Sequence, residues 1–279
     1  MLHLLEYCQN KNMERELEVA KNIAREAGRV LLEIYGSDHS VEWKGYDDPV
    51  TIADKSANEI IVAELRRQFP ADGILSEEAT DDAIRLSKSR VWFVDPMDGT
   101  KQFIEKIGEF SVMIGLAIEG KPVLGVVYQP TNNKMYYAAK GMGAYLEEPL
   151  TTKRLNVSPQ TDFSQMSAAM SRSHHSPQID RVNAKLGITQ KIQSGSVGLK
   201  VGILAEARAH LYLHLGSKTN QWDTCAPQAI LEAAGGIMTD RNGDDLLYNT
   251  KEIRNMTGIV GSNGVIHARV IEEIKNLFA

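Results

Sequence analysis

The sequence has few cysteines, no surplus of basic charge and no long apolar run. Only Cys8 and Cys225 occur among 279 residues, and neither has the nearby Cys partner that a zinc or redox motif needs. A disulfide framework is therefore not expected, which favours a reducing compartment.

The net charge of −5 and the lack of a basic stripe give no sign of a nucleic-acid-binding surface. No window is long and apolar enough to span a membrane, and the apolar start of the chain is too short for a signal peptide. We expect a soluble, cytoplasmic protein.

Internal repeats and low-complexity tracts are also absent, so a repeat architecture and a disordered chain are both excluded. A hydrophobic fraction of 43% is ample for a sizeable core. The length fits one large domain or two closely joined domains. Residues 149–159 have no strong periodicity, and we place a boundary there, between domains at 1–150 and 151–279.

The periodicity of apolar residues predicts helices and strands that alternate unevenly. Helices are predicted over 13–35, 54–67, 100–106, 179–186, 196–206, 222–234 and 266–277. Strands are predicted over 74–75, 91–94, 110–118, 123–128, 135–139, 144–146 and 209–213 and around 168, and 37–48 is predicted to be a polar loop. Uneven alternation fits an α/β (α+β) arrangement of layered sheets sandwiched by helices better than a regular barrel.

The segment Asp95-Pro-Met-Asp-Gly-Thr100 follows the apolar run Val91–Val94 directly. Two carboxylates therefore emerge where a buried strand ends, a usual place for ligand sites in α/β folds. Carboxylates so close together repel each other unless a cation lies between them, and Mg²⁺ prefers such oxygens. Gly99 and Thr100 open the predicted short helix at 100–106, whose free N–H groups suit a phosphate. The alternative is an ordinary turn in which Asp98 caps the next helix.

Further acidic residues stand at the edges of predicted elements. Asp54 begins the helix at 54–67, Glu77 and Glu78 follow the strand at 74–75, and Asp223 begins the helix at 222–234. Asp54 and Asp223 could simply be helix caps, and the Glu pair could be a solvated loop. Together with the pair in the Asp95 segment, however, they are typical of a divided metal site.

In these motifs the chain resembles the inositol monophosphatase superfamily. The matching segments are Asp48–Asp54, Ser76–Glu78, Asp95–Thr100, Trp222–Pro227 and Ala233–Gly236, and the resemblance covers roughly Leu17 to Gly261 in the same order. The resemblance implies a layered αβαβα sandwich. Lys101–Phe103 and Gly108–Phe110 look like the 3′(2′),5′-bisphosphate nucleotidase branch. So do Ser171–His174 and Ser194–Lys200, although the latter departs from the Gly-Ser-Ser-Leu-Lys form of bacterial relatives.

Carried over by position, the resemblance implies a site for two or three Mg²⁺ ions. The implied ligands are the side chains of Glu77, Asp95, Asp98 and Asp223 and the backbone carbonyl of Met97. Thr100, paired with Asp54 and assisted by Glu77, would orient and deprotonate a water for in-line attack on the phosphate. The N–H groups of Gly99 and Thr100 would bind the phosphate oxygens.

The resemblance also suggests substrate contacts, each of which has a structural alternative. Ser171, His174, Ser196, Lys200 and Asp223 would contact the nucleotide, with Lys200 facing its second phosphate. A lone Lys on a helix is usually a solvated surface residue, and His174 could belong to a polar loop.

The implied function is a Mg²⁺-dependent phosphatase that converts 3′-phosphoadenosine 5′-phosphate (PAP) to AMP and phosphate. Such an enzyme would serve sulfur metabolism, be inhibited by lithium, bind neither nucleic acid nor membrane, and be a monomer or homodimer. The nearest alternative is an inositol or sugar (fructose-1,6-bis)phosphatase with the same metals. A non-catalytic sensor of nucleotide or metal is a third reading.

Overall fold

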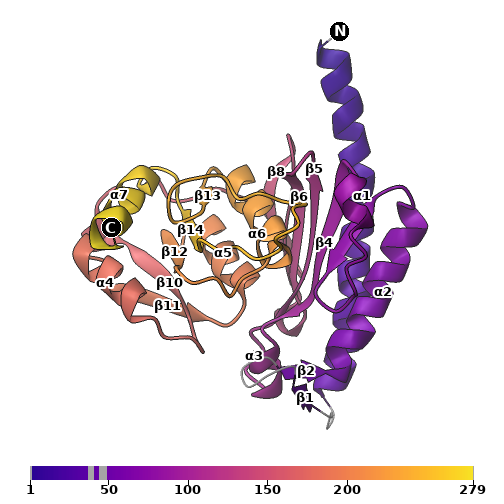
Figure 1. Cartoon of the computed structure of the whole chain (residues 1–279), viewed down its shortest axis with the longest axis horizontal. Helices are drawn as coiled ribbons and strands as arrows, with labels where there is room; N and C mark the ends of the chain where they lie inside the picture. The colour runs from indigo at the N-terminus through magenta and orange to yellow at the C-terminus, as the bar shows by residue number, and fades with distance from the viewer. Residues whose placement is uncertain (1, 37–40, 44–48, 279) are drawn as a thin grey trace.

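The computed structural model describes residues 2–36, 41–43 and 49–278, and within them helices and sheets alternate in the layer order αβαβα (Figure 1). The helices are α1 (Leu2–Tyr35), α2 (Ile52–Gln68), α3 (Thr100–Ile104), α4 (Pro177–Leu186), α5 (Val197–Ala205), α6 (Gln221–Ala233) and α7 (His267–Phe278). Helices α1 and α2 cover the outer face of the first sheet, α5 and α6 lie between the two sheets, and α4 and α7 cover the far face of the second. The expected fold class is confirmed.

The first sheet is a seven-stranded meander in the order β3-β4-β5-β6-β7-β8-β9. Its strands are β3 (Gly73–Ser76), β4 (Arg90–Asp98), β5 (Ser111–Ile118), β6 (Lys121–Gln129), β7 (Lys134–Ala139), β8 (Gly143–Glu148) and β9 (Thr151–Leu155). Only β3 and β4 run parallel to each other, and the other neighbours are antiparallel. A separate pair, β1 (Val41–Trp43) and β2 (Pro49–Thr51), precedes α2.

The second sheet has the order β11-β10-β12-β14-β13. Its strands are β10 (Ser167–Ser171), β11 (Gln190–Ser194), β12 (Leu211–His214), β13 (Ile237–Thr239) and β14 (Ile259–Ser262). Strand β10 is parallel to both β11 and β12, so these three strands end at the same edge of the sheet. In α/β folds this carboxyl edge is where ligand sites are built.

Several predicted elements differ from the observed ones at their ends. Helix α1 begins at Leu2 rather than at 13, and α3 ends at Ile104 because Lys106 has a positive φ of 58°. The predicted loop at 37–48 contains β1, and the rest of it lies outside the described residues. Strands β11, β13 and β14 were not predicted, since their short runs lack clear alternation. Strand β9 occupies part of the proposed boundary region, and the division at residue 150 stays a prediction.

Helix α6 packs against the first sheet at unusually close range, because two glycines give it room. A Cβ atom on Gly125 in β6 would lie 2.2 Å from the carbonyl oxygen of Ala226, and one on Gly115 in β5 would lie 2.7 Å from the Ala226 nitrogen. Both neighbours are helix backbone atoms, which cannot rotate away. The close packing brings the first turn of α6, with Asp223, up to the end of β4.

None of the helices in residues 2–36 and 49–278 is long and apolar enough to cross a membrane.

We predict that Gly125→Ala destabilises the protein by about 2 kcal/mol or more, because overpacking at backbone cannot be relieved by a side-chain rotation. Gly36→Ala is the matched control, since a Cβ there would meet nothing closer than 3.7 Å. Chemical denaturation followed by circular dichroism measures both. Equal midpoints for the two variants would contradict the close packing of α6.

Candidate metal centre

A β-bulge near the end of β4 turns Asp95 and Asp98 toward the same side of the sheet. Asp95 pairs with Met113 and the next pair is Asp98 with Ser111, so β4 has one residue more than β5 between these pairs. In a regular strand, residues three apart point to opposite faces. The extra residue cancels that alternation, which lets both carboxylates face α6.

Asp223 joins the two aspartates from the first turn of α6. Single carboxylate oxygens of Asp95, Asp98 and Asp223 lie within 4.8 Å of one another. Burial raises the pKa of Asp95 well above its usual range, and the charges of Glu77, Asp98 and Asp223 raise that pKa further. Burial likewise raises the pKa of Asp223, and Glu77 and Asp98 add to the effect. The cluster is therefore electrostatically unfavourable without a cation.

Glu77 approaches this cluster from the strand beside β4. Its backbone N–H donates to the carbonyl of Val94 at 3.1 Å, which continues the pairing of β3 with β4 beyond Ser76. The Glu77 carboxylate lies close enough to raise the pKa values of both Asp95 and Asp223. Four of the predicted ligand side chains thus gather in one place.

Polar groups from α5 hold Asp98 in position. The Asp98 carboxylate accepts hydrogen bonds from Ser196 Oγ at 2.5 Å and from the Gly198 N–H at 3.0 Å. Ser111, which is fully buried, lies 2.8 Å from Ser196 through their hydroxyl oxygens. Ser196 was predicted as a nucleotide contact, and its hydroxyl here orients a carboxylate. Ser111 and Gly198 were missed, because nothing local in the sequence shows that they meet Asp98.

Thr100 lies in hydrogen-bond contact with Asp54, as the resemblance implied. Its hydroxyl oxygen is 3.3 Å from Asp54 Oδ2 and 3.2 Å from the Met97 carbonyl oxygen. Asp54 is buried in the first turn of α2, and the Met97 side chain is buried in the core beneath the sheet. Only the backbone of Met97 is therefore available to the site. Gly99 has a φ of 101°, and this left-handed conformation turns the chain from β4 into α3.

The segments expected to contact substrate lie together, joined by an ion pair. Arg172 donates to both carboxylate oxygens of Glu109, at 2.7 and 2.6 Å, and the Gly195 N–H donates to Glu109 at 3.0 Å. The Gln102 amide donates to the hydroxyl of Ser173. These contacts connect the loop around Glu109 to the ends of β10 and β11.

Lys200 is buried, so its interpretation as a solvated surface residue is wrong. Its ammonium donates to the Gly195 carbonyl at 2.8 Å and lies 5.5 Å from the centre of the Tyr212 ring. Burial lowers the pKa of Lys200 to about 8, and the charges of Asp98 and Asp223 oppose that decrease. The cation therefore belongs to the same electrostatic unit as the carboxylates.

Two predicted contacts, Ser171 and His174, lie at the carboxyl edge of the second sheet. Ser171 Oγ and His174 Nδ1 are 3.5 Å apart, and the His174 N–H donates to Ser171 at 3.2 Å. His214, which the sequence analysis missed, ends the parallel neighbour β12 at this edge. Burial lowers the pKa of His214 to about 4, so it is neutral. A single His at the end of an apolar strand belongs to no recognisable sequence motif, so its place at this edge could not be predicted.

Asp223 also caps the start of helix α6, as the alternative interpretation of this residue predicted. The Asn220 N–H donates to Asp223 Oδ2 at 2.5 Å, which ties the carboxylate to the start of α6. One side chain thus caps the helix and completes the acidic cluster.

Comparison with known proteins shows which family has this arrangement. The sequence profile described as the Inositol monophosphatase family matches residues 12–278. This chain belongs to the inositol monophosphatase family. It is 40% identical over 239 residues to the 3′(2′),5′-bisphosphate nucleotidase CysQ of Salmonella typhimurium, covering 85% of this chain and 95% of that protein. The CysQ of Escherichia coli K12 is 38% identical over the same shares.

Solved structures of the family have the same fold. CysQ from Bacteroides thetaiotaomicron superposes with a TM-score of 0.78 at 33% identity, covering 89% of this chain and 97% of that one. The IMPase of Thermotoga maritima superposes with a TM-score of 0.80 at 26% identity, covering 94% and 98%. The motif resemblance, including its nucleotidase branch, is confirmed.

We predict that Asp95→Asn stabilises the metal-free protein at pH 7, since it removes a carboxyl group whose ionisation is unfavourable in this buried, repelling cluster. Each unit by which the folded pKa of an acid is raised corresponds to about 1.4 kcal/mol of lost stability above that pKa. The raised pKa of Asp95 means that this loss grows as pH rises from the unfolded value through the folded value. Thermal unfolding in EDTA measures the effect, and a lower melting temperature for the variant would contradict it.

Proposed function

We propose that this protein is a Mg²⁺-dependent phosphatase that releases the 3′-phosphate of 3′-phosphoadenosine 5′-phosphate to give AMP and phosphate. The observation that carries the proposal is the trio of Asp95, Asp98 and Asp223, which lies beside a buried lysine in a chain 40% identical to a bisphosphate nucleotidase. A role in sulfur metabolism, a cytoplasmic location, inhibition by lithium and a monomeric or homodimeric state remain predictions.

The donor set fits hard divalent cations. Every side chain in the trio offers carboxylate oxygens, and the cluster contains neither His nor Cys. Mg²⁺ binds such oxygens, whereas zinc favours nitrogen and sulfur. Glu77 and the Met97 carbonyl are proposed as further ligands. The Met97 carbonyl oxygen lies 3.2 Å from Thr100 Oγ1 and has two lone pairs, so at least one lone pair stays available for an ion.

In the proposed mechanism, these residues would hold Mg²⁺, which would supply positive charge to the phosphate oxygens and make a nearby water more acidic. A proton of that water moves to Thr100 Oγ1 as the hydroxyl proton of Thr100 moves to Asp54 Oδ2, 3.3 Å away, so that hydroxide attacks the phosphate. Glu77 assists in orienting the water. The N–H groups of Gly99 and Thr100 are proposed to bind the phosphate oxygens. Attack is in line, without a covalent phosphoenzyme.

Recognition of the nucleotide is assigned to the second sheet and α5. Lys200 is proposed to face the second phosphate, because it is a buried cation near Asp98 and Asp223. Ser171 and His174 offer hydrogen bonds at the carboxyl edge, and Ser196 and Asp223 are proposed to contact the substrate beside the metals.

The decisive experiment measures phosphate release from PAP, inositol 1-phosphate and fructose 1,6-bisphosphate, with and without Mg²⁺ and Li⁺. The proposal expects PAP to have the highest kcat/KM and expects the activity to require Mg²⁺. A preference for inositol 1-phosphate would instead support an inositol phosphatase. Binding of PAP without any release of phosphate would support a sensor.

We predict that Asp98→Asn lowers the rate by about 100-fold or more while the protein stays folded. The substitution removes one ligand charge from the proposed metal site, whereas the hydrogen bonds from Ser196 and Gly198 can still reach the remaining oxygen. Phosphate release and circular dichroism on the same sample check this. A wild-type rate in the variant would refute the metal assignment.

We also predict that Lys200→Met raises KM for PAP at least about 10-fold more than for inositol 1-phosphate, since only PAP carries a second phosphate. Steady-state assays on both substrates at saturating Mg²⁺ measure this difference. Equal losses on both substrates would place Lys200 outside the second-phosphate contact.

A further inference from the structure

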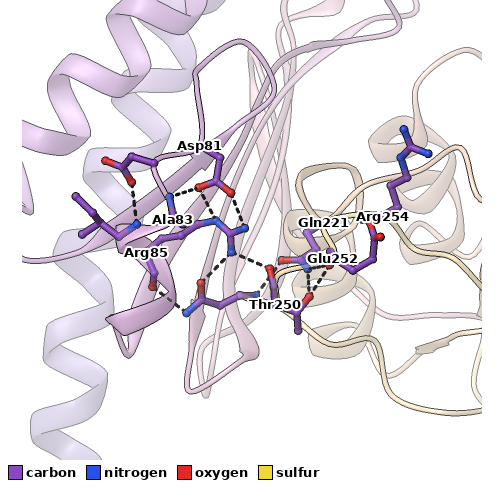
Figure 2. Close-up of polar contacts among 10 residues, drawn as sticks. Asp81, Ala83, Arg85, Gln221, Thr250, Glu252 and Arg254 are labelled. Carbon is purple, nitrogen blue, oxygen red and sulfur yellow. Dashed lines mark hydrogen bonds and ion pairs between the residues drawn. The ribbon is translucent and has the colours of Figure 1, made fainter.

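The buried guanidinium of Arg85 connects the segment that carries Glu77 to the segment that carries Asp223, and it has no role in the proposed mechanism. Arg85 belongs to the 3₁₀-helix η1 (Ile84–Ser87) between β3 and β4, and only 1% of it is exposed. It donates to both carboxylate oxygens of Asp81, at 3.1 and 2.8 Å. Its other terminal nitrogen donates to Asn249 Oδ1 and to the Thr250 carbonyl, both at 3.1 Å (Figure 2).

The 249–252 segment holds Arg85 from the opposite side. The Asn249 amide donates to the carbonyls of Arg85 and Lys88, each at 3.0 Å. Asn249 has a φ of 58°, a left-handed conformation that Asn tolerates better than most residues. Every polar atom of this amide is therefore engaged by η1 and the residues beside it.

Gln221 connects the 249–252 segment to helix α6. Its amide nitrogen donates to Thr250 Oγ1 at 2.6 Å and to the Glu252 carbonyl at 2.9 Å, and its amide oxygen accepts from the Asn249 N–H at 2.9 Å. Gln221 is 1% exposed and is the first residue of α6. Figure 2 shows these side chains as one continuous set of hydrogen bonds from Asp81 to Glu252.

This set of hydrogen bonds joins the two chain segments that carry Glu77 and Asp223. Asp81 and Glu77 lie in the same connection between β3 and β4, and Gln221 and Asp223 lie in the same first turn of α6. Strand β3 is at the edge of its sheet, so β4 supports it on one side only. Arg85 supplies a second support, and that support comes from the layer that carries Asp223.

We propose that Arg85 is a positioning residue for the metal site, which fixes Glu77 relative to Asp223 through Asn249 and Gln221. The inference rests on the proposed function, because it assumes that these carboxylates bind metal. A planar guanidinium suits the task, since it can form a fork with Asp81 and reach two further acceptors at once. Residues that orient metal ligands typically change metal affinity by about 10- to 100-fold when they are replaced.

The test uses Arg85→Lys, which keeps the charge but loses the fork, and Asn249→Gly, which loses the amide but keeps the left-handed backbone accessible. Arg90→Lys is the matched control. Arg90 also forms ion pairs, to Asp72 at 3.0 Å and Glu16 at 2.7 Å, but these join β4 to the α1 side. Binding of Mn²⁺ is titrated by electron paramagnetic resonance without substrate. The Mg²⁺ concentration for half-maximal rate and the KM at saturating Mg²⁺ are measured in parallel.

We expect Mn²⁺ affinity and Mg²⁺ activation to weaken at least about 10-fold in both network variants. KM at saturating metal should stay within about 2-fold, and Arg90→Lys should resemble the wild type in every measurement. Unchanged metal affinity in a folded Arg85→Lys or Asn249→Gly protein overturns the inference, and so does an equal loss in Arg90→Lys. A wild type that binds Mn²⁺ but prefers another phosphate ester would refute only the proposed substrate. A wild type that binds no Mn²⁺ would overturn both proposals.

Discussion

Mutual repulsion among buried carboxylates is the constraint around which this structure is organised. Single carboxylate oxygens of Asp95, Asp98 and Asp223 lie within 4.8 Å of one another. Burial raises the pKa values of all three, and repulsion by neighbouring carboxylates raises those of Asp95 and Asp223 further. Such a cluster does not form by itself, so packing elsewhere has to enforce it. The close approach of α6 to Gly115 and Gly125 and the hydrogen bonds from α5 to Asp98 serve this purpose. These contacts stabilise a local arrangement that is unfavourable without a cation.

The layer order explains why the carboxylates come from distant parts of the chain. Strand β4 delivers Asp95 and Asp98 from the first sheet, and α6 delivers Asp223 from the helical layer between the sheets. Neither layer can form the cluster alone, because the sheet contributes only Asp95 and Asp98 and the helical layer contributes only Asp223. The cluster therefore assembles only when the helices between the sheets dock on β4, β5 and β6. A ligand that joins these layers would stabilise the docked state, since it binds only the folded arrangement.

The residue types of the site could be predicted from sequence, whereas their supports could not. Asp95, Asp98 and Asp223 stand in local motifs at the edges of predictable elements, which is why they could be named. The bulge in β4 depends on its register with β5, and the contact of Ser111 with Ser196 joins strand β5 to the start of helix α5. From sequence alone a lone Lys on a helix is expected at the surface, whereas the fold places Lys200 in the interior beside Tyr212. Each of these features arises from pairing across long stretches of chain, which periodicity does not encode.

The division between chemistry and recognition follows from the same geometry. A carboxylate trio can act on any phosphate ester that reaches it, so it cannot select one substrate. Selection has to come from groups around the trio, and we propose those at the carboxyl edge of β10, β11 and β12 and in the loop that precedes α5. Ser171 and His174 contact each other at this edge. Lys200 differs, because its charge acts on both Asp98 and Asp223. If Lys200 binds the second phosphate as proposed, its recognition of that group is coupled to the electrostatics of the carboxylates, and substrate choice and metal affinity then cannot vary independently.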